Sequence, residues 1–299
     1  MKHWIPALMV VLVIQCAIVA TVFWPQQSSP ERDAKQVFAP FPTSAIDELH
    51  IGDQFDNEVV LVRSGKQWLL PELENLPAEA TKIDALLQHL TSQPESWPVA
   101  DSPAARQRFQ VADYYYQKRL QLYSGGQHLA TIYFGTSPGF RKVHARNDEQ
   151  DAIYSIAFDA VEVPAVSNAW LDTQLLQIRA PVRIDSDLYN LSFEDGRWLS
   201  ATGGRPDQKE LDRLIDTLRN LQVQGTAGED LQRELSAAEA DLVLRVQGLA
   251  GDVTLTLVAQ NDRHFIHSSE FPLFFECSAF DYDRLTGIDA GLISGEDSD

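Results

Sequence analysis

Hydrophobic residues along the chain recur with two spacings, one typical of helices and the other of strands. Residues 82–90 and 210–221 place leucine and isoleucine at i, i+3, i+4 and i+7, the spacing of a helix with one apolar face. Other runs, such as 242–246 and 253–257, alternate apolar and polar residues beside a glycine-containing turn. This alternation buries one face of a strand and leaves the other in water, which is typical of antiparallel sheet. The pattern predicts an α+β fold with amphipathic helices on a mixed, mostly antiparallel sheet.

This order of elements occurs twice along the chain. A turn followed by tryptophan, an amphipathic helix, a Leu-x-Leu strand and an Ala-Phe-Asp sequence follow one another in both halves. The matched segments are 63–68 with 194–198, 82–90 with 210–218, 120–122 with 242–244, and 157–159 with 279–281. The offsets of 130, 128, 122 and 122 residues differ only by short deletions. We therefore predict two tandem α+β modules, 45–175 and 176–292, each with the order ββ-α-ββββ and one amphipathic helix.

Residues 4–24 form an almost wholly apolar segment with Trp4 and Trp24 at its ends. At about 1.5 Å per residue a helix of this length spans roughly 30 Å, the thickness of the hydrocarbon core of a bilayer. Lys2 and the terminal amine precede the segment, whereas acidic residues follow it at positions 31 and 33. The segment predicts a retained transmembrane anchor, with residues 1–24 as cytoplasmic N-terminus and span and the rest of the chain on the opposite side.

Residues 4–24 have two alternative interpretations, a cleaved signal peptide and a lipoprotein signal. Ala17 and Ala20 offer weak cleavage positions for a signal peptide, but the apolar run continues past both. A lipoprotein signal needs a small residue before the lipidated cysteine, whereas Gln15 precedes Cys16 in the middle of the span. The retained anchor is the favoured interpretation, and cleavage is the open alternative.

The segments that flank the two modules have the composition of flexible chain. Residues 25–44 contain four prolines and three serines, which disfavours a helix and predicts a tether. A flexible chain of this length reaches roughly 25 Å. Residues 293–299 include Glu296, Asp297 and Asp299 and predict a solvated acidic tail.

Composition and charge narrow the classes of function. A hydrophobic fraction of 44% excludes wholesale disorder. The 24 Lys and Arg against 43 Asp and Glu give a formal net charge of −19. This acidic balance argues against nucleic acid as a partner, because phosphate binding needs clustered Lys and Arg, and it equally disfavours anionic lipid headgroups. The two cysteines, Cys16 and Cys277, are too few for a disulfide framework.

Residues that could carry catalysis or bind a metal do not form a recognisable motif. His264 and His267 are three residues apart, whereas a zinc-binding pair on a helix needs i and i+4, and a strand would turn them to opposite faces. Cys277 lies in an apolar strand, where a buried, unreactive thiol is expected. The sequence has no Gly-x-Ser-x-Gly nucleophile motif and no phosphate-binding Gly-Lys-Ser/Thr loop. We expect no enzymatic activity, no cofactor and no metal site.

Three consecutive tyrosines, Tyr114, Tyr115 and Tyr116, are the candidate partner-binding surface. Neighbouring residues of a strand point to opposite faces, so the three rings cannot all be buried on one face. Exposed aromatic side chains bind sugars or partner proteins, although an exposed tyrosine also occurs as a plain surface residue. The sequence therefore predicts a binding surface here and leaves the plain surface residue as the alternative.

Other residues that recur in both modules have an expected structural role. Trp68 and Trp198 follow equivalent turns and are expected in the two cores. Asp159 and Asp281 follow a repeated Ala-Phe and are expected as helix N-caps, and Asp207 is expected to cap the second amphipathic helix.

The N-terminal anchor, the turn-Trp hairpin, the leucine-rich helix and the strands that end at 153–156 (Ile-Tyr-Ser-Ile) resemble the bacterial DUF4340 family. The resemblance covers most of residues 44–290. At 109–113 that family usually has an aromatic-Gly-Leu-Asp-Pro stretch; here Gln110 replaces the glycine and no proline follows Asp113. Members are often encoded beside an ABC-type transporter whose permease resembles the gliding-motility auxiliary type. The resemblance implies an extracytoplasmic accessory subunit, with the ATPase on another chain.

These observations lead to one expected function and two alternatives. We expect a single-pass protein of the bacterial inner membrane, with its N-terminus in the cytoplasm and most of the chain in the periplasm. It would be a non-catalytic accessory subunit of an ABC-type transport system, with the permease and its separate ATPase subunit as partners. The first alternative is a free-standing cell-envelope binding module for glycan or protein, and the second is a hydrolase with an unrecognised site.

Overall fold

The structure is a computed structural model that describes Leu12, Gln15, Phe38 and residues 41–93, 97–201, 203–249 and 251–295. The expected anchor at 4–24, apart from Leu12 and Gln15, lies outside the described residues, as do most of the tether and the last four residues of the acidic tail. The two expected flexible segments are shorter than predicted, because Phe38 is buried in the core of the first module and Ile293 is buried at the end of the last helix. Within the described ranges, no helix is both long enough and apolar enough to cross a membrane.

The first module is built on an eight-stranded antiparallel sheet. Its strands are β1 (Glu48–Asp53), β2 (Glu58–Ser64), β3 (Gln67–Leu70), β4 (Leu76–Ala78), β7 (Lys118–Ser124), β8 (Gln127–Phe134), β9 (Val143–Asn147) and β10 (Tyr154–Ile156). They lie in the order β10-β9-β8-β7-β1-β2-β3-β4. The other elements of the module are η2 (Thr43–Ala45), η3 (Pro71–Leu73), α2 (Ala80–Thr91), α3 (Pro103–Arg108), the hairpin β5 (Val111–Ala112) and β6 (Tyr115–Tyr116), η4 (Ala160–Glu162) and η5 (Ser167–Trp170).

The second module has the same construction. Its strands are β11 (Pro181–Asp185), β12 (Asn190–Glu194), β13 (Arg197–Ser200), β14 (Val223–Thr226), β15 (Leu242–Gly248), β16 (Gly251–Gln260), β17 (Arg263–Ser268) and β18 (Phe274–Cys277). They lie in the order β13-β12-β11-β15-β16-β17-β18-β14. Its helices are α4 (Gln208–Asn220), α5 (Glu229–Ala237), α6 (Ala279–Thr286) and α7 (Ala290–Ser294).

The two sheets share the order of seven strands, as the internal repeat predicts. The series β10-β9-β8-β7-β1-β2-β3 corresponds, strand by strand, to β18-β17-β16-β15-β11-β12-β13. The eighth strand differs, because β4 extends the first sheet beside β3 whereas β14 extends the second beside β18. The α+β class and the large antiparallel sheets are therefore confirmed.

Three details of the expected modules are corrected. Every strand pairing within the described ranges is antiparallel, so the sheets are not mixed there. At least three strands precede each long helix, because β1 and β11 add a central strand to the expected pair. Additional short helices, α3, α5 and α7, accompany α2 and α4.

Each sheet is covered on both faces. The apolar face of α2 (Ile83, Leu86, Leu87 and Leu90) is buried in a core cluster with strand residues such as Leu49 and Ile132. On the opposite face, Tyr133 of β8 packs with Val111 and Ile153 beneath α3 and the β5–β6 hairpin. Successive residues of β8 thus serve two cores, because alternate side chains of a strand point to opposite faces. In the second module α5 covers the outer face through a cluster that includes Leu235 and Phe265.

The two strands that the modules do not share lie at the junction between them. The backbone N–H of Asp172 donates to Pro77 O on β4 at 2.9 Å, and the N–H of Val223 on β14 donates to Thr173 O at 2.9 Å. The connecting segment therefore bonds to the edge strands of both sheets. Edge strands present unpaired backbone groups, and this arrangement satisfies some of them.

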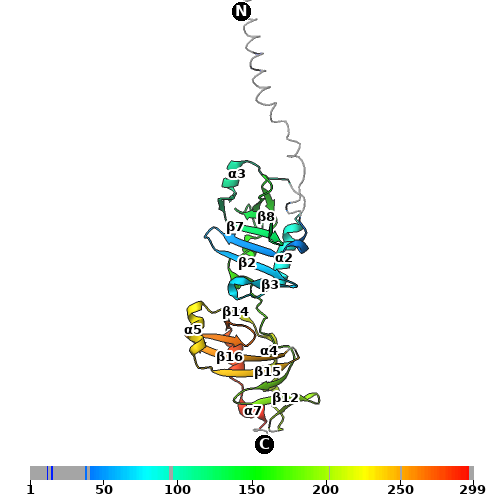
Figure 1. Ribbon diagram of the computed structural model, residues 1–299, viewed down its shortest axis with the longest axis vertical. Coiled ribbons are helices and arrows are strands. Elements are labelled where there is room, and N and C mark those ends of the chain that lie inside the picture. Colours follow the sequence, from blue (N-terminus) through cyan, green and yellow to red (C-terminus); the bar gives the residue numbers. More distant parts are fainter. Residues whose placement is uncertain are drawn as a thin grey trace, which may run out of the picture.

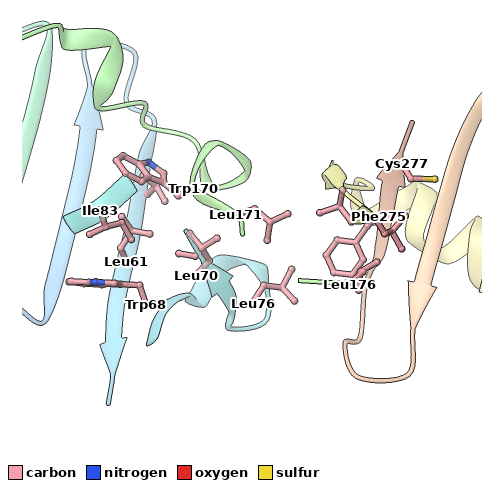
Figure 2. Close-up of a cluster of buried hydrophobic side chains, with 14 of the residues drawn as sticks. Leu61, Trp68, Leu70, Leu76, Ile83, Trp170, Leu171, Leu176, Phe275 and Cys277 are labelled. Atoms are coloured by element: carbon pink, nitrogen blue, oxygen red, sulfur yellow. The ribbon is translucent and has the colours of Figure 1, made fainter. Parts of the chain in front are cut away.

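Apolar side chains make the junction continuous. Leu70, Leu76 and Leu171 on the side of the first module approach Leu176 and Phe275 on the side of the second (Figure 2), and all five belong to one buried cluster that extends through both modules. The modules lie end to end along the long axis of the molecule (Figure 1). Because the core does not break at the junction, the two modules form one elongated body.

The repeated structural residues keep some of their expected roles and lose others. Asp159 caps η4 and Asp207 caps α4, as predicted. Asp281 is not the N-cap of α6: Ser278 holds that position, and its hydroxyl accepts the N–H of Asp281 at 3.0 Å. Trp68 is fully buried, but Trp198 is only half-buried. Both tryptophans therefore contact the core, as predicted, but Trp198 packs against its edge and is less completely buried than Trp68.

Candidate interaction site in the first module

Positive charge is concentrated in one part of this acidic chain. Residues 102–147 carry seven of the 24 Lys and Arg but only one, Asp113, of the 43 Asp and Glu. The segment runs from α3 through the β5–β6 hairpin and β7 to β9. Helix α3 lies at the end of the first module that points away from the second module (Figure 1). The net charge of the whole chain conceals this basic segment.

The segment that ends α3 approaches the β8–β9 connection closely enough to require glycine. A Cβ atom on Gly135 would lie 1.9 Å from Phe109 O and 2.5 Å from Gln110 O. Thr136 N donates to Phe109 O at 2.9 Å, which joins the two backbones. Gly135 therefore allows the end of α3 to lie directly on the sheet.

Gln110, which replaces the glycine of the family pattern, ends α3 in the left-handed region with φ of 56°. This conformation favours glycine, so the side chain has to offset some backbone strain. Its Nε2 donates to Tyr115 Oη at 2.6 Å, and its Oε1 accepts from Gln117 Nε2 at 2.6 Å. Gln110 thus fixes the β5–β6 hairpin relative to α3.

A buried arginine attaches the same hairpin to the sheet. Arg146 on β9 is only 5% exposed, and its Nε donates to Val111 O at 2.8 Å. Its guanidinium lies over the Tyr133 ring, 4.8 Å from the centroid. Burial lowers the pKa of Arg146, with Arg106 adding to that effect. The group stays charged at neutral pH, because an arginine titrates far above that range.

His144 belongs to a stack of side chains behind the surface. Its ring lies 4.1 Å from the Phe109 ring, and the guanidinium of Arg108 lies 4.6 Å from that same ring on Phe109. Thr136 Oγ1 lies 2.9 Å from His144 Nδ1. Burial lowers the pKa of His144, and the charge of Arg108 lowers it further. The imidazole is therefore neutral at neutral pH and supports the position of Arg108.

The three sequence-predicted tyrosines divide between the surface and the interior. Tyr114 at the tip of the β5–β6 hairpin is 73% exposed and Tyr115 is 43% exposed. Tyr116 is half-buried against Tyr133, with ring centroids 5.5 Å apart. A further aromatic, Phe140 in the β8–β9 connection, is 91% exposed. Two of the three tyrosines are thus available to a partner.

Four of the seven cations are buried or form ion pairs within the fold, and the other three are exposed to solvent. The first four are Arg106 with Asp151, Lys118 with Asp53, Arg119 with Glu58, and the buried Arg146. Arg108, Arg141 and Lys142 are exposed, and no carboxylate of the described chain lies within ion-pair distance of them. We group them with Tyr114 and Phe140 as the interaction site, because backbone and side-chain bonds join the three segments that carry them: Thr136 N donates to Phe109 O at 2.9 Å, and Gln110 Nε2 donates to Tyr115 Oη at 2.6 Å.

A hollow of about 300 Å³ lies beside Phe140 in the interaction site. Its lining includes Arg141 and Lys142 from the β8–β9 connection, Gln117, and Asp159 at the start of η4. The hollow is partly open to solvent, with two cations and one carboxylate on its wall. Its lining suits recognition of a polar or charged surface group.

The sequence pattern predicts the tyrosines of this site but not its cations or Phe140. The net charge of the chain hides the signal, which lies in the count of charges within residues 102–147. That local count points to Arg108, Arg141 and Lys142, although it does not show that they lack an ion pair with any described carboxylate.

The remaining candidates from the sequence have local structural partners. The ring of His264 packs at a tilt against Tyr282, with centroids 4.4 Å apart, and that of His267 packs in the same way against Phe274, with centroids 4.9 Å apart. Cys277 is buried, and burial, with Asp281 nearby, raises the pKa of its thiol to about 12. In the part of the chain that the structure describes, no group of three or more His, Cys, Asp or Glu is placed to hold a metal ion.

A larger hollow of about 710 Å³ lies between α4 and α6. Arg213 and Arg284 line it together with the exposed Phe280. Both arginines already bond within the fold: Arg213 donates to the carbonyl of Gly287 at 3.3 Å, and Arg284 Nε donates to Thr217 Oγ1 at 2.8 Å. Its two arginines are therefore less available than the cations of the interaction site, and its third cation, Lys209, lies beside Asp212 and Asp216 in the same lining.

Comparison with known protein families gives one match. A family model described as a domain of unknown function, DUF4340, matches residues 68–243. The matched stretch begins in β3 of the first module and ends in β15 of the second, so it spans the junction. Comparisons with curated proteins and with solved structures gave no match.

Proposed function

Because this chain belongs to the DUF4340 family, we propose that it is a non-catalytic periplasmic subunit of an ABC-type transport system. One transmembrane helix at residues 4–24 anchors it in the bacterial inner membrane, with the N-terminus in the cytoplasm. The anchor packs beside the permease, and the two modules form an arm that braces a periplasmic part of the machine. The ATPase is a separate subunit. The two modules arise from duplication of one ancestral module.

The observation that carries this proposal is the continuous buried core at the junction between the modules. A brace has to transmit position from one end to the other, and a flexible linker would not do so. Here Asp172 and Thr173 bond to the edge strands of both sheets, and Leu171, Leu176 and Phe275 fill the space between them (Figure 2). Burial of such side chains on both sides resists bending at the junction.

The interaction site supports a binding role at one end of this arm. Tyr114 and Phe140 are large exposed aromatics, and aromatic and Arg side chains are enriched where proteins recognise partners. Arg108, Arg141 and Lys142 add charge that is not used by the fold. The site therefore has the chemistry of recognition, which is what an accessory subunit needs.

A pull-down of the tagged full-length chain in mild detergent tests the proposal, with all co-purifying proteins identified by mass spectrometry. We expect an ABC permease and its ATPase in near-stoichiometric amounts. A chain in which residues 4–24 are replaced by an unrelated transmembrane helix is the matched control, and it should recover less permease.

Each outcome of the pull-down decides a different point. Equal recovery by the anchor-swapped chain would move the permease contact to the two modules. Recovery of the chain without any transporter subunit would overturn the proposal. In that case binding of the full-length chain to envelope polysaccharide would favour the free-standing binding module, for which the exposed Tyr114 is the supporting feature.

A further inference from the structure

We propose that the interaction site docks on anionic phospholipid headgroups and thereby fixes the orientation of the arm relative to the membrane. The inference deepens the proposed function, because it rests on residues 4–24 acting as an anchor that keeps the first module beside a bilayer. It names the ligand of the interaction site, which the accessory-subunit role leaves open. The net charge of −19 alone would predict the opposite behaviour.

The distribution of charge resolves that contradiction. At physiological ionic strength, exposed charges act over about 8 Å, the Debye length. A surface that touches lipid is therefore governed by its own charges, here three cations against the nearby carboxylates of Asp113 and Asp159, and the acidic residues of the distant second module are screened. Arg108, Arg141 and Lys142 have no ion pair with any described residue, so their charge is available to phosphate oxygens.

The aromatic residues of the site fit the interfacial zone of a bilayer. Phe140 occupies the β8–β9 connection with two cations immediately after it, and Tyr114 occupies the tip of the hairpin. An exposed ring flanked by Arg or Lys places an apolar group among the acyl chains while the cations stay at the phosphates. In a soluble arm such a 91% exposed phenylalanine is unfavourable, whereas at the headgroup level it is stabilised.

The length of chain before the first module is consistent with this contact. The expected span ends at residue 24, and Phe38 is already buried in the core of the first module, where Asn147 Nδ2 donates to its carbonyl oxygen at 3.4 Å. About 13 residues separate the two points, and a chain of that length with the composition of a tether extends on the order of 20 Å, so an anchored module would stay close to the headgroups. Tethering at this distance raises the effective concentration of the site at the bilayer.

The test uses the full-length chain in lipid nanodiscs with an environment-sensitive fluorophore on α3. In a Cys16→Ser background, Gln107→Cys carries the probe, because Gln107 is exposed and its side chain makes no bond to a described residue. Leu249→Cys in the β15–β16 turn of the second module carries the control probe. Quenching by spin-labelled lipid is compared in phosphatidylcholine nanodiscs and in nanodiscs with 30% phosphatidylglycerol.

We expect the Gln107 probe to be quenched in phosphatidylglycerol nanodiscs and the Leu249 probe to stay unquenched. The variant R108E/R141E/K142E should reduce the quenching about tenfold or more, because three cations become anions. The matched variant K66E/R197E/R245E has the same change in charge at exposed positions outside the interaction site and should keep it. Raising the salt concentration to 0.5 M should weaken the effect.

Equal quenching in the two kinds of nanodisc, or equal loss in the two triple variants, would overturn the lipid assignment. Quenching that appears only when a nanodisc holds two copies would assign the site to a second copy of this chain, through its acidic surface, and would likewise overturn it. The experiment contains no permease, so its outcome is independent of the pull-down. A negative result here together with a recovered permease would leave the accessory-subunit proposal standing.

Discussion

Replacement of Gly135 by alanine tests whether close backbone contact holds the interaction site on the first sheet. Gly135 N donates to His144 O at 2.9 Å, and Thr136 N donates to Phe109 O at 2.9 Å, so the backbones run side by side. A Cβ at Gly135 would lie 1.9 Å from Phe109 O and 2.5 Å from Gln110 O. Ordinary contact needs about 3.5 Å, so the end of α3 would have to move by roughly 1.5 Å.

The free-energy cost of Gly135→Ala depends on the kind of atom that the new Cβ contacts. Over-packing of a folded interior costs about 1–3 kcal/mol, and the upper end applies here because a backbone carbonyl cannot rotate away as a side chain does. A loss of about 3 kcal/mol lowers the Tm of a chain of this size by about 6–12 °C. Gly139→Ala is the matched control, because Gly139 lies in the same connection and a Cβ there would meet nothing within 4 Å.

The assay combines thermal unfolding followed by circular dichroism with hydrogen exchange of the full-length chain in mild detergent. Gly135→Ala should lower Tm and speed exchange in residues 103–117, which contain α3 and the hairpin. Gly139→Ala should behave as the unmodified chain. The reasoning would be refuted by two variants with the same Tm and the same exchange in that segment.

Three further predictions concern single side chains. Arg146→Met removes the bond to the hairpin and the contact with Tyr133, so the hairpin should exchange faster at a cost of about 1–2 kcal/mol; unchanged exchange would contradict this. The Arg263 hydrogen bond lowers the pKa of Glu276 from its usual 4.5, so this pair stabilises the fold above that value and loses the effect as the pH falls through the lower folded pKa. Glu276→Gln should therefore remove up to about 1 kcal/mol from the stability that the protein loses at acid pH, a limit set by the exposure of the pair. The Tm of the variant should fall less steeply with decreasing pH, and an unchanged fall would argue against this. In a Cys16→Ser chain, Cys277 should resist maleimide at pH 7.5 until the protein unfolds, because burial raises the pKa of its thiol to about 12; rapid labelling of the folded chain would contradict its burial.

The elements of each module follow largely from local sequence. The helical spacing of leucines in 82–90 and 210–221 corresponds to α2 and α4, and the alternation in 242–246 and 253–257 corresponds to β15 and β16. These patterns are decisive because the period of apolar residues has to match the period of the backbone for one face to be buried. The short central strands β1 and β11 lacked so clear a pattern and were missed.

The repeat in the sequence did not determine how each copy of a residue is used. Phe158 is 1% exposed and stacks on Phe134, whereas its repeat partner Phe280 is 66% exposed beside α4. Trp68 is likewise more completely buried than its repeat partner Trp198. An equivalent position along the chain does not ensure an equivalent environment, because burial depends on which distant segments pack against it.

The interaction site and the junction were decided by tertiary structure. Sequence alone identified Tyr114 and the apolar segment at 4–24, and a local count of charge would have added the basic segment. Only the folded chain shows that Arg106, Lys118 and Arg119 are paired while Arg108, Arg141 and Lys142 are free of described carboxylates. It also shows that β4 and β14 meet the connecting segment. The period of apolar residues depends on neighbours along the chain, so it can be identified in the sequence. These ion pairs and edge-strand contacts join residues that are far apart along the chain, so they exist only once the chain has folded.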